Sequence, residues 1–558
     1  MKLRVAYAKS RYKDTVYTTP LVVTSYRDEN GTARNKTVAS LAKLPEYIVK
    51  LIEKALKQGN ADVLDEFVHI DEIEHQHSIV MGPVFVVWHV LKQLGIFSLL
   101  FRFLQVKQAV IILAVVVERV VAAKPVSMMA SQRLFAQSPL AYLLGMEKSP
   151  ALNTWYNALA KLESHREEIL QELYQRNHTP GELYLYDITS SYFEGDTCPL
   201  GAYGYNRDGK KGKKQVVIGV ICDEAGCPIW VDVFKGNTAD QSTVKQQLLN
   251  LRDKLQVRHF TFVGDRGMLT NARIEELETE GWWESFCYIT ALKRSEMMQL
   301  IEDDTHPLQL ELFAHENLAE VEKDGVRYVL CHNPNRQEQD GETRQRLLAL
   351  TEEKLESLRR NVEAGRYKQK EEIARRLYNW INRWGMERFF TVQYDEGEFL
   401  YARKTEEIER YARLDGCYVI RSNSNAERQS TEALRERYKD LKYVEQAFRI
   451  MKTTDIQVRP IRHFNEPQVR GHIFACFLAY RVIWELRQRL RPVLERDPDT
   501  RRCEAGSLTE IWRELEQISI AKLNIKNRKV FKLSKVNAYA KKLLKLCKVP
   551  TLEDLLSE

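Results

Sequence analysis

The stretch that decides the fold is LYLYDITSSYFEGD, residues 183–196. Its first seven residues are aromatic, β-branched or leucine around a single acid, Asp187, a composition typical of a strand. An acid near the end of a strand meets solvent and substrate while the sheet holds it in place. The stretch therefore predicts a core strand, Leu183–Thr189, that carries a functional carboxylate.

Four more β-branched and aromatic runs follow this strand. Between the third and fourth strands of the set, Thr238-x-x-Gln241 forms a capping box that starts a helix, and a second helix is predicted over Asn271–Glu280. Three strands able to form hairpins, then helix, strand, helix and strand, indicate an α/β fold with a mixed sheet, which fits an RNase H-like core. The added strands are predicted at Gln215–Cys222, Ile229–Phe234, Phe260–Val263 and Phe286–Leu292.

Changes of composition along the chain divide it into five expected regions. Thr179-Pro180-Gly181 is a turn signal at the first boundary. After the fifth strand, short strands around a charged helical stretch interrupt the α/β rhythm and indicate an insertion. The regions are a mainly helical N-terminal region (1–180), the first part of the core (181–294), an α+β insertion (295–424), the second part of the core (425–490) and a basic C-terminal region (491–558).

Charge and composition restrict the class of protein. The 558 residues contain 84 Lys+Arg and 77 Asp+Glu, a net charge of +7 that permits an anionic partner. The excess is local, because residues 522–548 hold ten Lys/Arg and no acid, interspersed with apolar residues. We expect a folded basic element that binds DNA.

Cysteine and hydropathy patterns indicate the compartment. The nine cysteines are scattered without a CxxC pair, which fits reduced thiols in the cytoplasm. The apolar stretch 79–123 is interrupted by charged residues before about 20 apolar residues accumulate, so it predicts buried helices rather than a membrane span. The N-terminus has no apolar signal-peptide segment.

Three carboxylates lie where such a core needs them. Asp187 is near the end of the first strand, Asp265 follows the fourth in HFTFVGDRGM, and Glu445 lies within a helix predicted over Thr431–Lys452. Two aspartates from neighbouring strands and a helical glutamate can hold two Mg²⁺ ions roughly 3.5–4 Å apart. The chemistry indicated is phosphodiester cleavage or transfer.

The predicted helix places cations beside Glu445. At about 100° per residue, Tyr438 and Lys452 fall about 20° to either side of Glu445, and Lys442 and Arg449 lie on the flank away from the apolar stripe. These cations suit DNA phosphates. A solvated helix carries similar charges, so the pattern alone leaves catalysis and surface charge equally open.

Five ordered motifs resemble the DDE transposases of bacterial insertion sequences. The likeness is greatest to the branch with a Tyr-Arg-Glu-Lys signature and a large insertion before the glutamate, and it covers roughly residues 180–490. The motifs are DITSSYFEG (187–195), VFKGNTAD (233–240), VGDRGM (263–268), Tyr438-x6-Glu445-x6-Lys452, and QVRPIRHF (457–464) followed by GHIFACFLAYR (471–481).

The resemblance implies roles for individual residues. Asp187, Asp265 and Glu445 become the catalytic, metal-binding triad for two Mg²⁺ ions, with Mn²⁺ as a substitute. Tyr438 and Lys452 become contacts to DNA phosphates near the scissile bond. The signature arginine falls on Leu441, so its charge would come from Lys442 or Arg449. Arg266, beside Asp265, is a further expected DNA contact.

The resemblance also implies a reaction and partners. It implies Mg²⁺-dependent cleavage at the element's ends and transfer of the freed 3′-hydroxyls to target DNA, by a homodimer in the paired-end complex. Residues 1–180 would bind the terminal inverted repeats, and residues 491–558 would bind DNA or dimerise. The protein would be cytoplasmic and DNA-associated, without a membrane partner. The alternatives are an RNase H-like nuclease without strand transfer and a non-catalytic DNA-binding descendant.

Several polar features have two interpretations. Asp232 and Asp240 are also acids near the core, but we interpret them as a strand-edge residue and a helix first-turn residue. The basic loop 206–214 is an exposed tip or a phosphate contact. Trp380 and Trp384 share a helical face and either stack on an extruded base or pack in a core.

Overall fold

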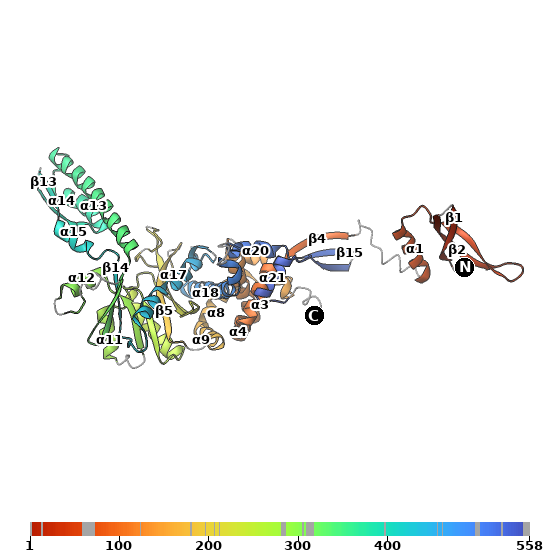
Figure 1. Ribbon diagram of the computed structural model, residues 1–558, viewed down its shortest axis with the longest axis horizontal. Coiled ribbons are helices and arrows are strands. Elements are labelled where there is room, and N and C mark those ends of the chain that lie inside the picture. Colours follow the sequence, from red (N-terminus) through yellow and green to blue (C-terminus); the bar gives the residue numbers. More distant parts are fainter. Residues whose placement is uncertain are drawn as a thin grey trace. The chain divides into compact units, whose positions relative to one another are not determined.

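The computed structural model describes residues 3–550 apart from 13–14, 59–72, 123, 179–180, 196, 206, 211, 281–285, 304–305, 309–316, 396–397, 455, 460, 497–502 and 526–527. The boundary signal at Thr179-Pro180, and Asn206 and Lys211 of the basic loop, therefore lie outside the described residues. The chain divides into two compact units (Figure 1). The first contains residues 1–82, 516–537 and 552–558, and the second contains residues 83–515 and 538–551.

The first unit begins with a small antiparallel sheet. Strands β1 (Leu3–Tyr12), β2 (Thr15–Arg27) and β3 (Ala33–Ser40) lie in that order, and helix α1 (Glu46–Gln58) follows. A small apolar cluster of Val22, Leu41 and Val49 joins helix and sheet. Every residue of β3 is exposed, so this strand has no alternating apolar pattern. That explains why the sequence, which is strand-like over residues 3–26, gives no signal for β3.

A second sheet of this unit brings together distant parts of the chain. Strand β4 (Ile73–Val80) pairs antiparallel with β15 (Ser519–Ile525), which pairs with β16 (Arg528–Leu533). The N-terminal 180 residues thus contain strands as well as the expected helices. The basic stretch 522–548 is also divided, since β15 and β16 belong to the first unit and helix α21 (Ala538–Leu546) to the second.

The second unit is built on an eight-stranded mixed sheet, in the order β10-β11-β14-β9-β8-β5-β6-β7. Strands β5 (Leu183–Tyr192), β6 (Gln215–Asp223) and β7 (Pro228–Lys235) are antiparallel neighbours. Strands β8 (Phe260–Gly264) and β9 (Phe286–Ala291) run parallel to β5. The predicted RNase H-like mixed sheet is confirmed, with strand bounds within a few residues of those expected.

The insertion contributes to the core sheet, which the sequence did not indicate. Strands β10 (Leu318–Lys323), β11 (Val326–His332) and β14 (Cys417–Ser422) extend the sheet beyond β9. The remainder of the insertion has its own apolar core. This remaining part of the insertion contains α13 (Pro334–Glu363), α14 (Lys370–Ile381), β12 (Phe390–Asp395), β13 (Glu398–Arg403) and α15 (Thr405–Ala412).

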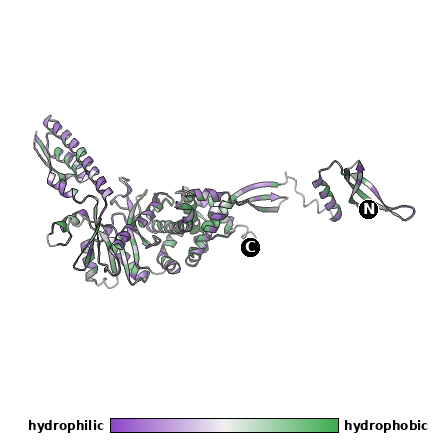
Figure 2. Cartoon of the chain, in the orientation of Figure 1, coloured by the Kyte–Doolittle hydropathy of each residue, from purple (hydrophilic) through white to green (hydrophobic). Residues whose placement is uncertain are grey.

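Helix α13 shows how this separate core is formed. The helix is largely hydrophilic along its length (Figure 2). It buries Leu348, Leu355, Leu358 and Val362 at helical spacing, on a face packed against α14 and β13. Trp380 and Trp384 are partly buried against the same core. They therefore pack in the insertion rather than presenting free ring faces.

Buried helices pack in the same unit as the sheet. The central one, α18 (Glu466–Arg489), packs against α5 (Val106–Val121), α8 (Leu152–Ser164) and β7. A Cβ atom at Gly471 would lie 1.9 Å from the carbonyl oxygen of Leu159, so only glycine permits this approach of α18 to α8. Helix α9 (Arg166–Asn177) packs against α8 and β7, and Trp512 of helix α20 (Leu508–Glu516) donates to the carbonyl of Val120 in α5.

The apolar stretch 79–123 forms short helices. Helices α3 (Gly82–Gln93) and α4 (Ile96–Phe103) are separated by a bend of 72°. In the described part of the chain, no single helix combines the length and hydropathy of a membrane span, although this bent pair passes the same test together.

The helix predicted over Thr431–Lys452 is interrupted. It consists of α16 (Thr431–Lys439) and α17 (Leu441–Arg449), joined at Asp440, and a π-helical turn from Ile450 to Thr454. Helix α17 packs against β5 and β6. The interruption changes the positions of Tyr438 and Lys452, which no longer share one helix with Glu445.

Candidate active site

Asp187 and Asp265 are brought together by parallel strand pairing. Strand β5 pairs with β8 in a register that places Tyr186 opposite Gly264. Asp187 and Asp265 are the next residues on these two neighbouring strands. The two acids are therefore adjacent, as predicted, but Asp187 lies in the middle of β5, which continues to Tyr192, and only Asp265 follows the end of its strand.

Glu445 completes the group from the helix above the sheet. It is exposed on α17, whose apolar face, with Val444 and Phe448, is buried. Asp187, Asp265 and Glu445 line one cavity of about 740 Å³. The sheet and the helix thus present all three predicted acids to the same space.

The environment of Asp187 opposes its negative charge. Burial, together with the carboxylates of Asp265 and Glu445, raises the pKa of Asp187 to about 7, although the N–H of Ile188 and the guanidinium of Arg207 act in the opposite direction. A cation placed among the three acids would relieve this repulsion. The donor set consists of carboxylate oxygens, which Mg²⁺ and Mn²⁺ prefer, so the residues fit a divalent metal.

Asp265 is held by its neighbours. Its Oδ1 accepts hydrogen bonds from the N–H of Arg266 at 2.7 Å and from the hydroxyl of Tyr438 at 3.4 Å. Burial, and then the charge of Asp265, raise the pKa of Tyr438. Tyr438 therefore stays a neutral donor. It contacts an acid of the site, a partner that the sequence does not predict.

Cations surround the cavity. Arg266 and Lys442, both predicted from the sequence, line it, as do Lys439 and Arg294. Arg336 and Asp340, on the first turns of α13, line it as well and form an ion pair at 3.0 Å. Nothing local in α13 indicates that its first turns line this cavity, so the sequence does not predict this contribution.

Two predicted DNA contacts do not line this cavity. Arg449 lies at the last position of α17. The ammonium of Lys452 donates to Thr189 Oγ1 at 2.7 Å and to Asp208 Oδ1 at 2.8 Å, and only 11% of its side chain is exposed. Burial lowers the pKa of Lys452. Its partner Asp208 belongs to the basic loop 206–214.

The basic loop 206–214 is partly anchored. Arg207 donates to both carboxylate oxygens of Asp240, at 2.6 and 2.7 Å. Lys213 forms an ion pair with Glu194 at 2.9 Å. Asp240 is the first residue of helix α10 (Asp240–Leu249), as its interpretation in the sequence requires.

Asp232 has a structural role. Its Oδ2 accepts hydrogen bonds from Trp230, Gln247 and Asn250, and its Oδ1 lies 3.0 Å from Arg166. The side chain is buried away from the three acids' cavity. Asp232 therefore lies on the edge strand β7, as its interpretation in the sequence requires, but it is buried in hydrogen bonds and does not belong to the group of three acids.

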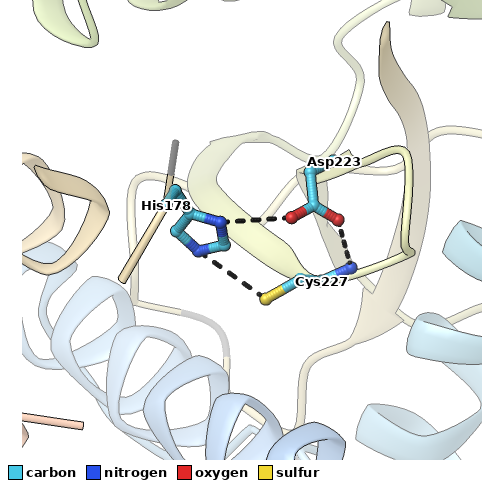
Figure 3. Close-up of side chains that lie close together, drawn as sticks. All are labelled: His178, Asp223 and Cys227. Carbon is cyan, nitrogen blue, oxygen red and sulfur yellow. Dashed lines mark hydrogen bonds and ion pairs between the residues drawn. The ribbon is translucent and has the colours of Figure 1, made fainter. Parts of the chain in front are cut away.

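A second polar cluster lies elsewhere in the unit (Figure 3). His178 Nδ1 lies 3.1 Å from Asp223 Oδ2, and His178 Nε2 lies 3.8 Å from Cys227 Sγ. Among the described residues, this is the one group of His, Cys, Asp and Glu with ligand atoms all within 4.8 Å. The guanidinium of Arg481 also donates to Cys227 Sγ. A cation against the sulfur makes this cluster a poor metal site.

An RNase H-like sheet that presents an acid within β5, an acid directly after β8 and a helical acid to one cavity is typical of enzymes of phosphodiester chemistry. The family model of the transposase DDE domain matches residues 179–482, more than half of the chain. The chain belongs to this family and is a DNA transposase. The N-terminal domain of IS1634 family transposases matches residues 5–66, which identifies an insertion-sequence transposase. Enzymes with this domain use a divalent metal and act on DNA.

Other comparisons find more distant likeness. The chain is similar to the piggyBac transposase of a synaptic complex with hairpin DNA, at 12% identity, over 86% of this chain and 84% of that one, with a TM-score of 0.34. It is also similar to the Mos1 transposase of a paired-end complex, at 16% identity, over 32% and 62% of the two chains, with a TM-score of 0.15. No curated protein matches the chain.

Proposed function

We propose that this transposase cleaves the ends of its element in a Mg²⁺-dependent reaction and transfers the 3′-hydroxyl ends to target DNA. Asp187, Asp265 and Glu445 would be its catalytic residues and would hold two Mg²⁺ ions. The observation that carries the proposal is the cavity shared by these three acids inside the matched DDE domain.

The acids have complementary tasks in this proposal. When bound, the two ions would activate the attacking oxygen and stabilise the leaving one. Asp187 and Asp265 hold fixed positions because their strands are hydrogen-bonded neighbours, and Tyr438 keeps the Asp265 carboxylate oriented.

The surrounding cations would bind the substrate. Arg266, Lys442, Lys439 and Arg336 line the same cavity as the acids, so they would contact phosphates on either side of the scissile bond. Arg449 would contact DNA farther along α17. Lys452 is paired with Asp208, so it would either hold the site in place indirectly or break this ion pair to contact a phosphate.

The partners proposed are the terminal inverted repeats, target DNA and a second copy of this chain in the paired-end complex. The regions outside the catalytic core, residues 1–180 and 491–558, would recognise the ends or dimerise. We propose that the protein works in the cytoplasm, which fits its nine free cysteines.

The test uses a linear DNA that carries the inverted repeats flanking the coding sequence. With Mg²⁺, the wild type is expected to cut at the repeats and, when given pre-cut ends and a plasmid, to join them. Glu445→Gln should lose both activities, whereas Glu432→Gln, at an exposed position of α16, should retain them. Cleavage without joining would favour a nuclease, and equal cleavage by Glu445→Gln would exclude the assigned triad.

A further inference from the structure

Asp208 is a buried carboxylate in the loop between β5 and β6, and only 2% of its side chain is exposed. Its Oδ1 lies 2.8 Å from the ammonium of Lys452 and contacts the guanidinium of Arg459. Its Oδ2 accepts the backbone N–H of Tyr192 at 3.1 Å. One carboxylate thus forms ion pairs with two cations and accepts a hydrogen bond from a strand N–H.

These partners belong to the two elements that carry the first and third acids. Lys452 lies in the π-helical turn that directly follows α17, the helix of Glu445. Tyr192 is the last residue of β5, the strand of Asp187. The ammonium of Lys452 also donates to Thr189, two residues after Asp187 and on the same face of β5.

The exit of this turn is attached to the same strand. Ile461 forms a parallel bridge with Phe193, and the N–H of Glu194 donates to the Ile461 carbonyl at 2.9 Å. Arg459 is therefore held beside the end of β5 by the backbone as well as by Asp208. Within the described residues, the Asp208 carboxylate is the group that joins Lys452, Arg459 and β5 at one point.

We propose that Asp208 is a positioning residue for the metal site, and this inference rests on the proposed function. By neutralising Lys452 and Arg459 against β5, it sets the spacing between Asp187 and Glu445. Without the negative charge, Lys452 and Arg459 would lose the ion pairs that hold them at β5, and the turn after α17 would move away from the strand. Metal ligands on the two elements would then no longer meet their ions together.

A positioning role of Asp208 can be distinguished from a second role, in which its carboxylate only competes with a DNA phosphate for Lys452. If Asp208 only occupied a phosphate position beside Lys452, removing its charge would free Lys452 and tighten DNA binding. If Asp208 positions α17, removing its charge weakens metal binding and leaves metal-free DNA binding unchanged. Competition for a phosphate position therefore predicts tighter DNA binding in the variant, whereas a positioning role predicts weaker metal binding with unchanged metal-free DNA binding.

The experiment measures Mn²⁺ binding to the full-length protein without DNA, by the electron paramagnetic resonance signal of free Mn²⁺. Asp208→Asn keeps an acceptor for the Tyr192 N–H and removes the charge, and we expect Mn²⁺ affinity to fall about tenfold. Glu194→Gln, which releases Lys213 of the same loop, should bind Mn²⁺ as the wild type does. Wild-type Mn²⁺ affinity in Asp208→Asn would overturn the proposal, as would tighter metal-free binding of end DNA.

Two further variants keep the outcome interpretable. Asp208→Asn combined with Lys452→Met restores the charge balance, so it should fold even where Asp208→Asn alone does not, and its Mn²⁺ affinity should stay low. Normal affinity in this double variant contradicts the positioning role. Asp187→Asn tests the proposed metal site itself. If Mn²⁺ binding is unaffected by Asp187→Asn, the triad assignment fails, and with it the role of Asp208.

Discussion

The hydroxyl of Tyr438 donates to Oδ1 of Asp265 across 173 positions of sequence, at 3.4 Å. Tyr438 stands at the end of α16, and Asp265 directly follows β8. The hydrogen bond orients the strand-end acid toward the cavity without adding charge, since burial raises the pKa of Tyr438 and keeps the phenol protonated.

The first prediction concerns this hydrogen bond. Tyr438→Phe should slow DNA cleavage roughly fivefold, the equivalent of about 1 kcal/mol for one lost hydrogen bond, with little change in DNA binding. The cleavage rate at saturating DNA and Mg²⁺ checks this. Tyr443→Phe, on α17 near Glu445, is the control and should cleave at the wild-type rate. Equal rates for the two variants would contradict the role of Tyr438.

The second prediction concerns pH and the metal-free protein. Burial and neighbouring acids raise the pKa of Asp187 to about 7 in the folded state, above its value in an unfolded chain. The folded state therefore binds this proton more tightly, and the contribution of Asp187 to stability falls as pH rises from about 4 toward 7. In EDTA, Asp187→Asn should melt at a higher temperature than the wild type at pH 8.

The same linkage gives the control for this measurement. The melting-temperature difference between Asp187→Asn and wild type should shrink toward pH 5, where the wild-type carboxyl is mostly protonated. The same comparison for Asp232→Asn should give no gain at pH 8, because that carboxylate is hydrogen-bonded and paired with Arg166. A difference independent of pH would show that the charge of Asp187 is not the cause.

The third prediction concerns the close approach of α18 and α8. Gly471→Ala would place a Cβ atom 1.9 Å from the Leu159 carbonyl oxygen, so one helix must move. We expect a loss of about 1–3 kcal/mol of stability, measured as a lower melting temperature. Gly181→Ala has open space around its Cβ and should melt as the wild type does. A neutral Gly471→Ala would mean that the helices separate without cost.

The fourth prediction concerns the connection of β11 to the segment before α16. Arg327 is 2% exposed, pairs with Glu320 at 2.6 Å and donates to the carbonyls of Ser424 and Gln429. Arg327→Met should destabilise the second unit by about 3 kcal/mol, because it leaves these acceptors and a carboxylate unpaired. Thermal unfolding followed by near-ultraviolet circular dichroism measures the effect.

A double variant tests the mechanism of that loss. Adding Glu320→Gln to Arg327→Met removes the unpaired charge, so the double variant should be more stable than the single one. Additive losses would instead indicate that Arg327 acts only through the backbone carbonyls.

Part of this architecture could be predicted from local pattern. The apolar runs of β5 and β8 are buried, so their composition alone identifies them, together with the acid that interrupts β5 and the acid that follows β8. In contrast, β3 is wholly exposed and β4 pairs with β15, more than 400 positions away, so neither has a local apolar signal. The extension of the core sheet by β10, β11 and β14 depends equally on distant pairing partners.

The sequence by itself determined the acids, their order and the core strands, because a buried strand must be apolar throughout and a functional carboxylate interrupts that pattern visibly. The tertiary structure alone decided the partners of the charges. Lys452 is an exposed cation by helical angle, yet it is buried against Asp208, and α13 brings Arg336 to the cavity. Burial and ion pairing depend on which distant segments fold together, and the residues adjacent in sequence do not predict those long-range contacts.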